Sequence, residues 1–115
     1  MFTKLLAATE TPTDCDECVT MALRTAQRHG AKVFVLHVLE SDTTIYRNYV
    51  RHFRTGEEIV ADDTYAADVE KELEARCSWA ARLPVAYSVK VKPGVPWDEI
   101  LKLARDENVD LIFLN

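Results

Sequence analysis

The sequence predicts an α/β protein built on a parallel sheet of four strands with helices on both faces. Strand-like apolar segments alternate with helix-like segments along all 115 residues, the order that a parallel sheet with right-handed crossovers requires. The run KVFVLHVL at residues 32–39 is apolar on both alternating sides, as expected for a strand covered on both faces. We therefore expect a doubly wound sheet in a single domain spanning residues 1–115.

Composition and charge narrow the class of protein. Apolar residues make up 48% and charged residues 29% of the chain, as in ordinary globular domains. The net charge of −5 gives no reason to expect a nucleic-acid partner, and no apolar run reaches the ~18 residues of a membrane span. The N-terminus has no signal-peptide pattern, and an odd number of cysteines fits free thiols. We expect a cytoplasmic protein with no membrane partner.

The first half of the chain predicts a strand, a helix and a second strand. Residues 2–9 form a short apolar run, and the TPTD sequence at 11–14 contains residue types that begin helices. Gly30 suits the helix end because glycine readily takes the left-handed conformation. The apolar stripe of this helix recurs at three- and four-residue spacing and comprises Cys18, Val19, Ala22, Leu23 and Ala26.

A long helix is predicted over residues 57–83, after a less regular segment at 41–56. Pro84 would end this helix, because the residue before a proline disfavours helical geometry. Its predicted apolar stripe comprises Ala66, Val69, Leu73, Cys77 and Ala80.

The last part of the chain predicts a strand, a helix and a strand. Residues 85–91 alternate and favour a strand near a sheet edge, and Pro93-Gly94 favours a turn. Pro96 begins a helix, Asn108 caps it, and residues 109–114 form the final strand. The predicted buried face of this helix comprises Trp97, Ile100, Leu101 and Ala104.

Three stretches together resemble the universal stress protein family: KLLAATE, VFVLHVLE and VKPGVPWDEILKLARDENVDLIFL. The resemblance covers essentially the whole chain in order and spacing. It implies a flavodoxin-like, adenine nucleotide alpha hydrolase-like sheet, which has five strands in the family. It also implies binding of ATP or AMP and a homodimer formed through the fifth strand.

The family holds nucleotide phosphates in a glycine-rich loop that directly follows the fourth strand. Here that loop would begin at Asn115, which stands in place of the first glycine. We therefore expect the chain to lack the last βα unit, and to bind ATP or AMP weakly or not at all. The strand at 109–114 would then be an open sheet edge, prone to pair with another chain.

Ligands of doubly wound sheets bind where the direction of winding reverses, here between the first and fourth strands. The predicted site residues are Ala8, Thr9, Glu10, Val38, Leu114 and Asn115. The resemblance implies that Ala8 and Val38 contact adenine, and that Glu10 replaces an aspartate that meets the base or ribose. The alternative is that Ala8 and Val38 are core residues and Glu10 is a solvated acid.

Other reactive side chains have simpler interpretations. Cys15 and Cys18 have CxxC spacing, yet the neighbouring acids disfavour a thiolate, so a structural role is favoured over a redox role. His37 is expected to be a hydrogen-bonded core residue. Residues 44–54 mix aromatic and basic side chains, which fits either phosphate binding or one packed helix face. No metal-ligand set or catalytic constellation converges.

The leading hypothesis is a regulatory domain of the stress response that binds adenine nucleotide, partner proteins or both. A family member that has lost nucleotide binding and acts only through protein contacts is the main alternative. A weak ATPase or thiol oxidoreductase is a third hypothesis, from a different class.

Overall fold

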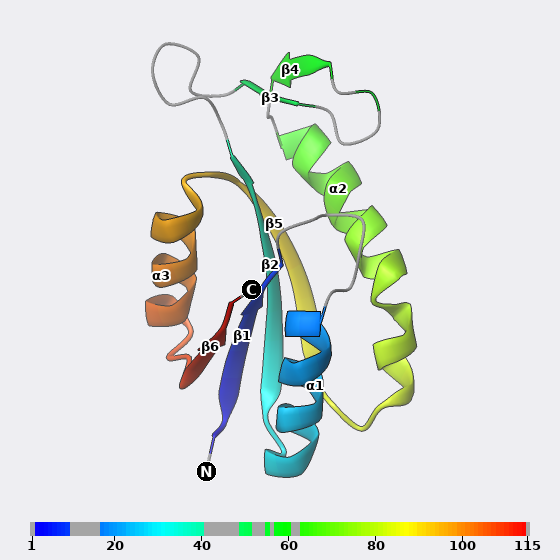
Figure 1. Ribbon diagram of the computed structural model, residues 1–115, viewed down its shortest axis with the longest axis vertical. Helices are drawn as coiled ribbons and strands as arrows, with labels where there is room; N and C mark the ends of the chain where they lie inside the picture. The colour runs from blue at the N-terminus through cyan, green and yellow to red at the C-terminus, as the bar shows by residue number, and fades with distance from the viewer. Residues whose placement is uncertain are drawn as a thin grey trace.

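Four parallel strands form the main sheet of the computed structural model, in the order β5-β2-β1-β6 (Figure 1). Their bounds are β1 Lys4–Ala8, β2 Lys32–Glu40, β5 Tyr87–Gly94 and β6 Leu111–Phe113. The structure describes residues 2–9, 17–40, 49–51, 55, 57–60 and 63–114. Within them a second, two-stranded antiparallel sheet pairs β3 (Tyr49–Arg51) with β4 (Glu58–Val60).

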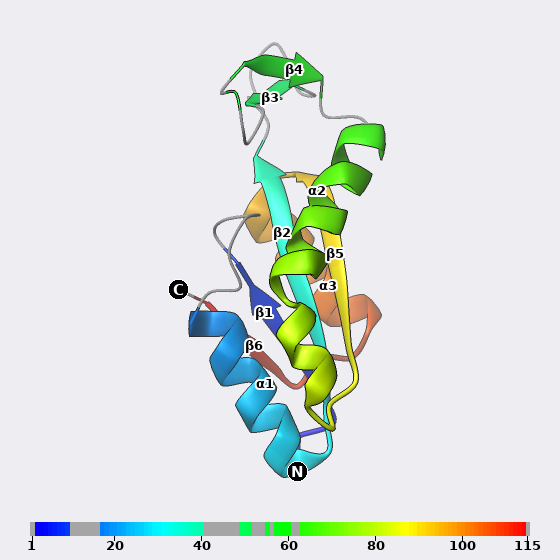
Figure 2. The ribbon, with the colours of Figure 1, turned by 90° about the vertical axis from the view of Figure 1, so that its right-hand side faces the viewer.

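Helices cover both faces of the main sheet, as predicted. Helices α1 (Glu17–His29) and α2 (Asp63–Arg76) lie on one face, and α3 (Pro96–Asp106) lies on the other (Figures 1 and 2). A short 3-10 helix, η1 (Ser78–Arg82), follows α2. The molecule is therefore a three-layer, doubly wound α/β sheet.

The winding reverses at β1. After β1 the chain builds outward through β2 to β5, and α3 then returns it to β6, on the other side of β1. Ala8 is in register with Leu36 of β2, and Ala7 is in register with Phe113 of β6. The carboxyl ends of β1, β2 and β6 consequently meet at one edge of the sheet, where ligands of this fold class bind.

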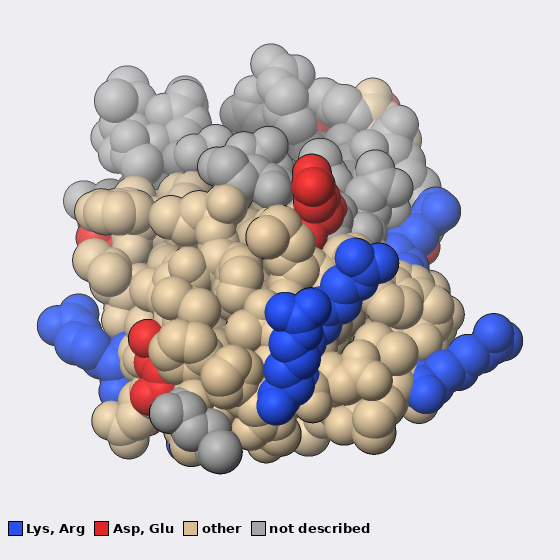
Figure 3. Space-filling view, turned by 60° about the horizontal axis from the view of Figure 1, so that its bottom comes forward, with Lys and Arg blue, Asp and Glu red and all other residues tan. Residues whose placement is uncertain are grey.

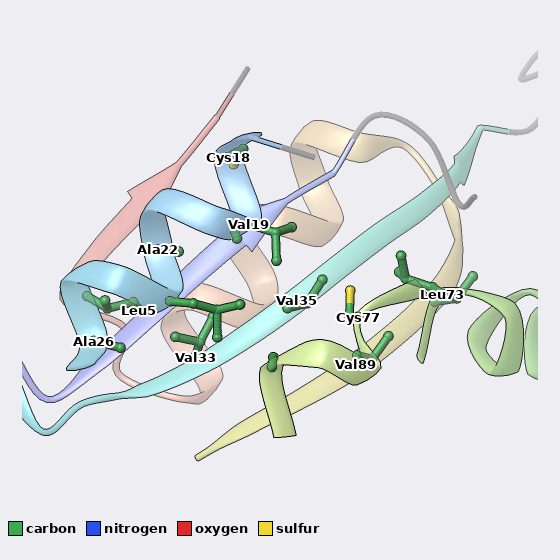
Figure 4. Packing of buried hydrophobic residues seen from close by; sticks show 14 of the residues in the cluster. Leu5, Cys18, Val19, Ala22, Ala26, Val33, Val35, Leu73, Cys77 and Val89 are labelled. Atoms are coloured by element: carbon green, nitrogen blue, oxygen red, sulfur yellow. The ribbon is translucent and has the colours of Figure 1, made fainter. Parts of the chain in front are cut away.

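Alternate residues of the central strands serve two separate cores. Leu5, Val33 and Val35 pack with α1 and α2 in the larger core (Figure 4). Leu6, Phe34 and Leu36 pack with α3 in the smaller one. This arrangement confirms that the second strand is covered on both faces, and it explains why KVFVLHVL shows no polar side.

Helix α1 carries the predicted apolar stripe, and all five of its residues are buried. Its end is also as predicted: Gly30 takes a left-handed conformation (φ 65°), and the Ala31 N–H donates to the Ala26 carbonyl (3.0 Å). The predicted start at 11–14 lies outside the described residues.

The predicted helix over 57–83 is wrong at both ends, although its apolar stripe is buried as expected. Residues 58–60 form β4 instead, in antiparallel register with Tyr49–Arg51 of β3, and the β-branched pair Ile59-Val60 favours a strand over a helix. The α-helix ends at Arg76, and the chain tightens into η1 before Leu83 becomes extended (ψ 148°), as a residue preceding proline prefers. The helix-face interpretation of 44–54 is likewise wrong at Tyr49 and Val50, which lie in β3.

The predicted buried face of α3 is only partly right. Ile100 and Leu103 are buried, but Trp97 and Leu101 are 61% and 40% exposed. The sheet can cover only one side of this helix, and α3 presents Ile100 and Leu103 to it, so the side carrying Trp97 and Leu101 faces outward. Asn108, in the left-handed region (φ 54°), follows the actual C-cap residue Glu107.

Strand β5 lies at a sheet edge, as predicted, but it continues through Pro93 and Gly94, where a turn was expected. An edge strand tolerates proline because one side of its backbone needs no strand partner. The Glu70 carboxylate of α2 accepts a hydrogen bond from the Val91 N–H (3.1 Å). A charged side chain thus occupies this edge and hinders pairing with a further strand.

A carboxylate joins the amino ends of β1 and β6. Asp110 Oδ2 accepts hydrogen bonds from the Thr3 N–H (2.6 Å), the Thr3 hydroxyl (2.9 Å) and the Lys4 N–H (2.9 Å). The hydrogen bond from the Thr3 N–H contributes most, and together these hydrogen bonds hold the pKa of Asp110 below its ordinary value of 3.8.

We predict that Asp110→Asn lowers the midpoint of thermal unfolding at pH 7. Because the folded-state pKa is depressed, the carboxylate stabilises the fold fully above 3.8, and this contribution is lost as pH falls through the folded pKa. The difference between parent and variant should therefore shrink on acidification, as measured by circular dichroism melts from pH 7 to about 2.

Asp106→Asn is the matched control, because Asp106 is exposed at the end of α3. It should follow the parent at every pH. A constant difference between parent and Asp110→Asn across the acid range would contradict the role of the ionised carboxylate.

Candidate functional site at the carboxyl ends of β1, β2 and β6

Ala8 and Val38 lie on the same face of the sheet, at the edge where the winding reverses. Both side chains are half-buried and pack against the smaller core, beside α3. Their partial exposure leaves an apolar surface at the carboxyl end of the sheet. The structure therefore brings together the two residues expected to contact adenine, and shows that each also belongs to the margin of the core.

Thr9 is held in place by contacts to β2. Its N–H donates to the Leu36 carbonyl (2.9 Å), so the parallel ladder extends one residue beyond β1. His37 Nδ1 is 3.0 Å from the Thr9 carbonyl oxygen, and since a carbonyl only accepts, Nδ1 carries the proton. His37 is buried and hydrogen-bonded, as predicted.

Cys18, in the first turn of α1, contacts the carboxyl ends of β1 and β6. Its thiol donates to the Phe113 carbonyl oxygen (3.0 Å) and lies 3.7 Å from the Ala8 carbonyl oxygen. The side chain is free of disulfide and buried. These contacts give Cys18 the structural role that was favoured. Cys15 lies outside the described residues.

The remaining predicted site residues are not all placed. Leu114 follows β6 and is 53% exposed, so its side chain is available at this edge. Glu10 and Asn115 lie outside the described residues. The described part of the site is thus Ala8, Thr9, Val38 and Leu114.

Two basic residues beside this site are not among the residues predicted from the sequence. Lys92 of β5 is in register with Val38, and Lys90 with Leu36. Register partners in a parallel pair point to the same face, so both lysines share the face of Ala8 and Val38. The alternation in SVKVK could have indicated this, because it places the valines in one core and the lysines on the opposite side.

Charge is not concentrated on the face shown in Figure 3, where described Lys and Arg side chains are spread over a mostly uncharged surface. Within the described residues, no group of three or more His, Cys, Asp or Glu could hold a metal ion. Over the same residues, no helix has the length and apolar character needed to cross a bilayer.

The fold is that of a doubly wound α/β protein, and the candidate site lies at its winding reversal. The model of the universal stress protein family matches residues 1–115. The chain therefore belongs to the universal stress protein family. Among curated protein sequences, none matches it significantly.

Solved structures support the same fold. A universal stress protein from Lactobacillus plantarum is 17% identical with a TM-score of 0.63, over 98% of this chain and 76% of that chain. One from Archaeoglobus fulgidus is 16% identical with a TM-score of 0.61, over 98% and 74%. A universal stress protein in complex with cAMP is 14% identical with a TM-score of 0.60, over 96% and 70%.

We predict that Cys18→Ala lowers the free energy of unfolding by about 1–2 kcal/mol, because the Phe113 carbonyl loses its donor and a small void replaces the sulfur. Chemical denaturation of parent and variant measures this difference. Cys77→Ala removes a buried thiol of the same core that lies between α2 and η1. It should destabilise the fold without affecting protection of the β6 amides from hydrogen exchange. Equal hydrogen-exchange rates of the β6 amides in Cys18→Ala and Cys77→Ala would contradict a role for the contact between Cys18 of α1 and Phe113 of β6.

Proposed function

We propose that this protein is a regulatory module of the stress response that binds an adenine nucleotide, ATP or AMP. The observation that carries this proposal is the half-buried apolar pair Ala8 and Val38 at the winding reversal of the sheet. A flat, largely apolar base suits such a surface, and the carboxyl edge of a doubly wound sheet is where ligands of this class bind.

Charge near the pair supports an anionic ligand. Lys92 shares a face with Val38 and lies one strand further out. A lysine ammonium binds phosphate as a point charge. In a chain of net charge −5, local positive charge of this kind favours binding of a nucleotide at this edge of the sheet over other parts of the surface.

The comparisons support the ligand class. One structural neighbour is a universal stress protein in complex with cAMP, an adenine nucleotide. We extend this ligand class to the present chain on the basis of shared family membership and of the geometry around Ala8 and Val38.

We expect the affinity for ATP to be weak in this chain. Asn115 stands where the glycine-rich phosphate loop of the family would begin, and a side chain there crowds the phosphates. Backbone N–H groups of a glycine-rich turn supply much of the phosphate binding in such loops. Replacement of the loop's first glycine by asparagine should therefore weaken phosphate binding and leave more of the affinity to the base.

The same substitution favours a second candidate function: a family member that acts only through protein contacts. In this case the protein recognises a partner protein and Ala8 and Val38 are ordinary core residues. We further propose a homodimer, supported by the outer edge of β6, which no described strand pairs. An unpaired strand edge is a ready surface for strand addition.

We propose that the protein acts by binding and not by catalysis, in the cytoplasm and without nucleic acid. The burial of Cys18 and its hydrogen bond to Phe113 oppose a thiol oxidoreductase, because a reactive thiol needs access. The free thiols of Cys18 and Cys77 suit a reducing compartment. The net charge of −5 opposes binding to a polyanion.

We predict that Val38→Phe lowers the affinity for adenine nucleotide at least tenfold. The added ring fills the apolar surface at the strand end and forces the base away, and overpacking of about 1.4 kcal/mol accounts for a factor of ten. Isothermal titration with ATP and with AMP, each at millimolar concentration, measures the effect.

Val85→Phe is the matched control, because Val85 is also half-buried but precedes β5 at the amino end of the sheet. It should bind nucleotide as the parent does. Equal binding by Val38→Phe and the parent would remove the site from this edge. Absence of nucleotide binding by the parent, with its fold intact, would favour the protein-contact function.

Native mass spectrometry of the purified protein tests ligand and oligomeric state together. We expect a dimer, with a mass increment of an adenine nucleotide on each chain when ATP is added at high concentration. An empty dimer would support the protein-contact function, and an empty monomer would contradict both the nucleotide and the dimer proposals.

A further inference from the structure

Two buried polar residues meet at the edge of the sheet where the candidate site lies. Apart from cysteine and tyrosine, the buried polar residues within the described part of the chain are Thr9, which is 6% exposed, and His37, which is 7% exposed. They contact each other, because His37 Nδ1 donates to the Thr9 carbonyl oxygen at 3.0 Å. Burial of a polar group costs free energy unless the group is hydrogen-bonded, so this contact stabilises both residues in place.

An apolar side chain would fill the position of His37 without any loss of hydration. Val35 and Leu39 lie two residues away on either side, point to the same face of β2 and belong to the larger core. A histidine between them must be desolvated and offers no more apolar contact than a leucine would. What the histidine adds is a donor that reaches Thr9, one residue beyond the end of β1.

The hydrogen bond joins the immediate neighbours of the apolar pair. Thr9 follows Ala8 in the chain, and His37 precedes Val38. Successive side chains of a strand point to opposite faces, so Ala8 and Val38 lie on the side of α3, whereas His37 points to the side of α1 and α2. His37 therefore contacts the backbone of the candidate site from the opposite face of the sheet and does not line the apolar surface.

We propose that His37 is a positioning residue for adenine binding, which holds the end of β1 against β2 through the Thr9 carbonyl and so sets the spacing of Ala8 and Val38. Ala8 and Leu36 are the last residues of β1 and β2 in register, so beyond them the two strands diverge unless a side chain links them. A flat base contacts both members of the apolar pair only while their spacing holds. The inference rests on the proposed function, to which it adds the residue that prepares the surface for the base.

Substitution of His37 tests this role by the affinity for AMP, measured by isothermal titration. His37→Leu keeps a side chain in the core but removes the donor to Thr9. It should bind AMP about tenfold more weakly than the parent, because an end of β1 that is free to move must be ordered when the ligand binds.

Two amide side chains separate the donor at Nδ1 from polarity alone. Asparagine and glutamine both carry amide donors, but the nitrogen of asparagine lies near the place of a histidine Nδ1, and that of glutamine lies near the place of Nε2. His37→Asn should therefore restore most of the affinity that His37→Leu loses, whereas His37→Gln should not. Equal affinities of the asparagine and glutamine variants for AMP would overturn the proposal, and this comparison decides the matter even if His37→Leu does not fold.

Val33→Ala is the matched control for lost stability, because Val33 is buried on the same face of β2 but near its amino end. It should destabilise the fold and leave the affinity for AMP unchanged. Weakening of AMP binding by Val33→Ala equal to that by His37→Leu would reduce the effect to stability and contradict a positioning role.

Hydrogen exchange tests the positioning without a ligand. The Thr9 N–H donates to the Leu36 carbonyl, so its protection reports whether the end of β1 stays on β2. In His37→Leu and His37→Gln, the Thr9 amide should exchange about tenfold faster relative to the Ala7 amide than it does in the parent, because the opening is local. Val33→Ala should leave this ratio of exchange rates unchanged.

The two measurements separate this inference from the proposed function. Binding of AMP by the parent, with an unchanged exchange ratio in His37→Leu and His37→Gln, would support the proposed function and overturn the role of His37. A raised exchange ratio in a protein whose parent form binds no AMP would contradict adenine binding, and it would support the link between His37 and Thr9.

Discussion

The structure depends on the burial of β1 on both faces and along both edges. Leu5 and Leu6 are each 0% exposed yet serve opposite layers, Leu5 with α1 and Leu6 with α3. Parallel pairing with β2 on one side and β6 on the other forces the chain to wind in two directions. The candidate site lies at this reversal, where Ala8 and Val38 are only half-buried.

The backbone around that site is fixed by contacts from three different elements. The Thr9 N–H continues the ladder to Leu36, His37 donates to the Thr9 carbonyl, and the Cys18 thiol reaches the Phe113 carbonyl. Each contact satisfies a polar backbone group that would otherwise be buried at a loss of free energy. Preorganisation of this kind suits a binding function, because less conformational entropy is lost when a ligand is held.

The edge of the sheet at β5 and the outer side of α3 differ in how far they are available for contact with another molecule. The β5 edge is occupied by the Glu70 carboxylate at Val91, which disfavours strand addition there. On α3, by contrast, the apolar side chains of Trp97 and Leu101 remain exposed.

Local sequence determined the order of elements, the double burial of β2, the stripes of α1 and α2, and the turns at Gly30 and Asn108, because each depends on near neighbours or on one residue's backbone preference. It also placed Ala8 and Val38 at strand ends.

It could not show that residues 58–60 pair with β3, that His37 and Cys18 reach across to other strands, or that Lys92 lies beside Val38. Periodicity on α3 indicated an apolar side but not its limits. Tertiary packing alone decided that Ile100 and Leu103 face the sheet while Trp97 and Leu101 face solvent, because a helix surface becomes core only where another element covers it.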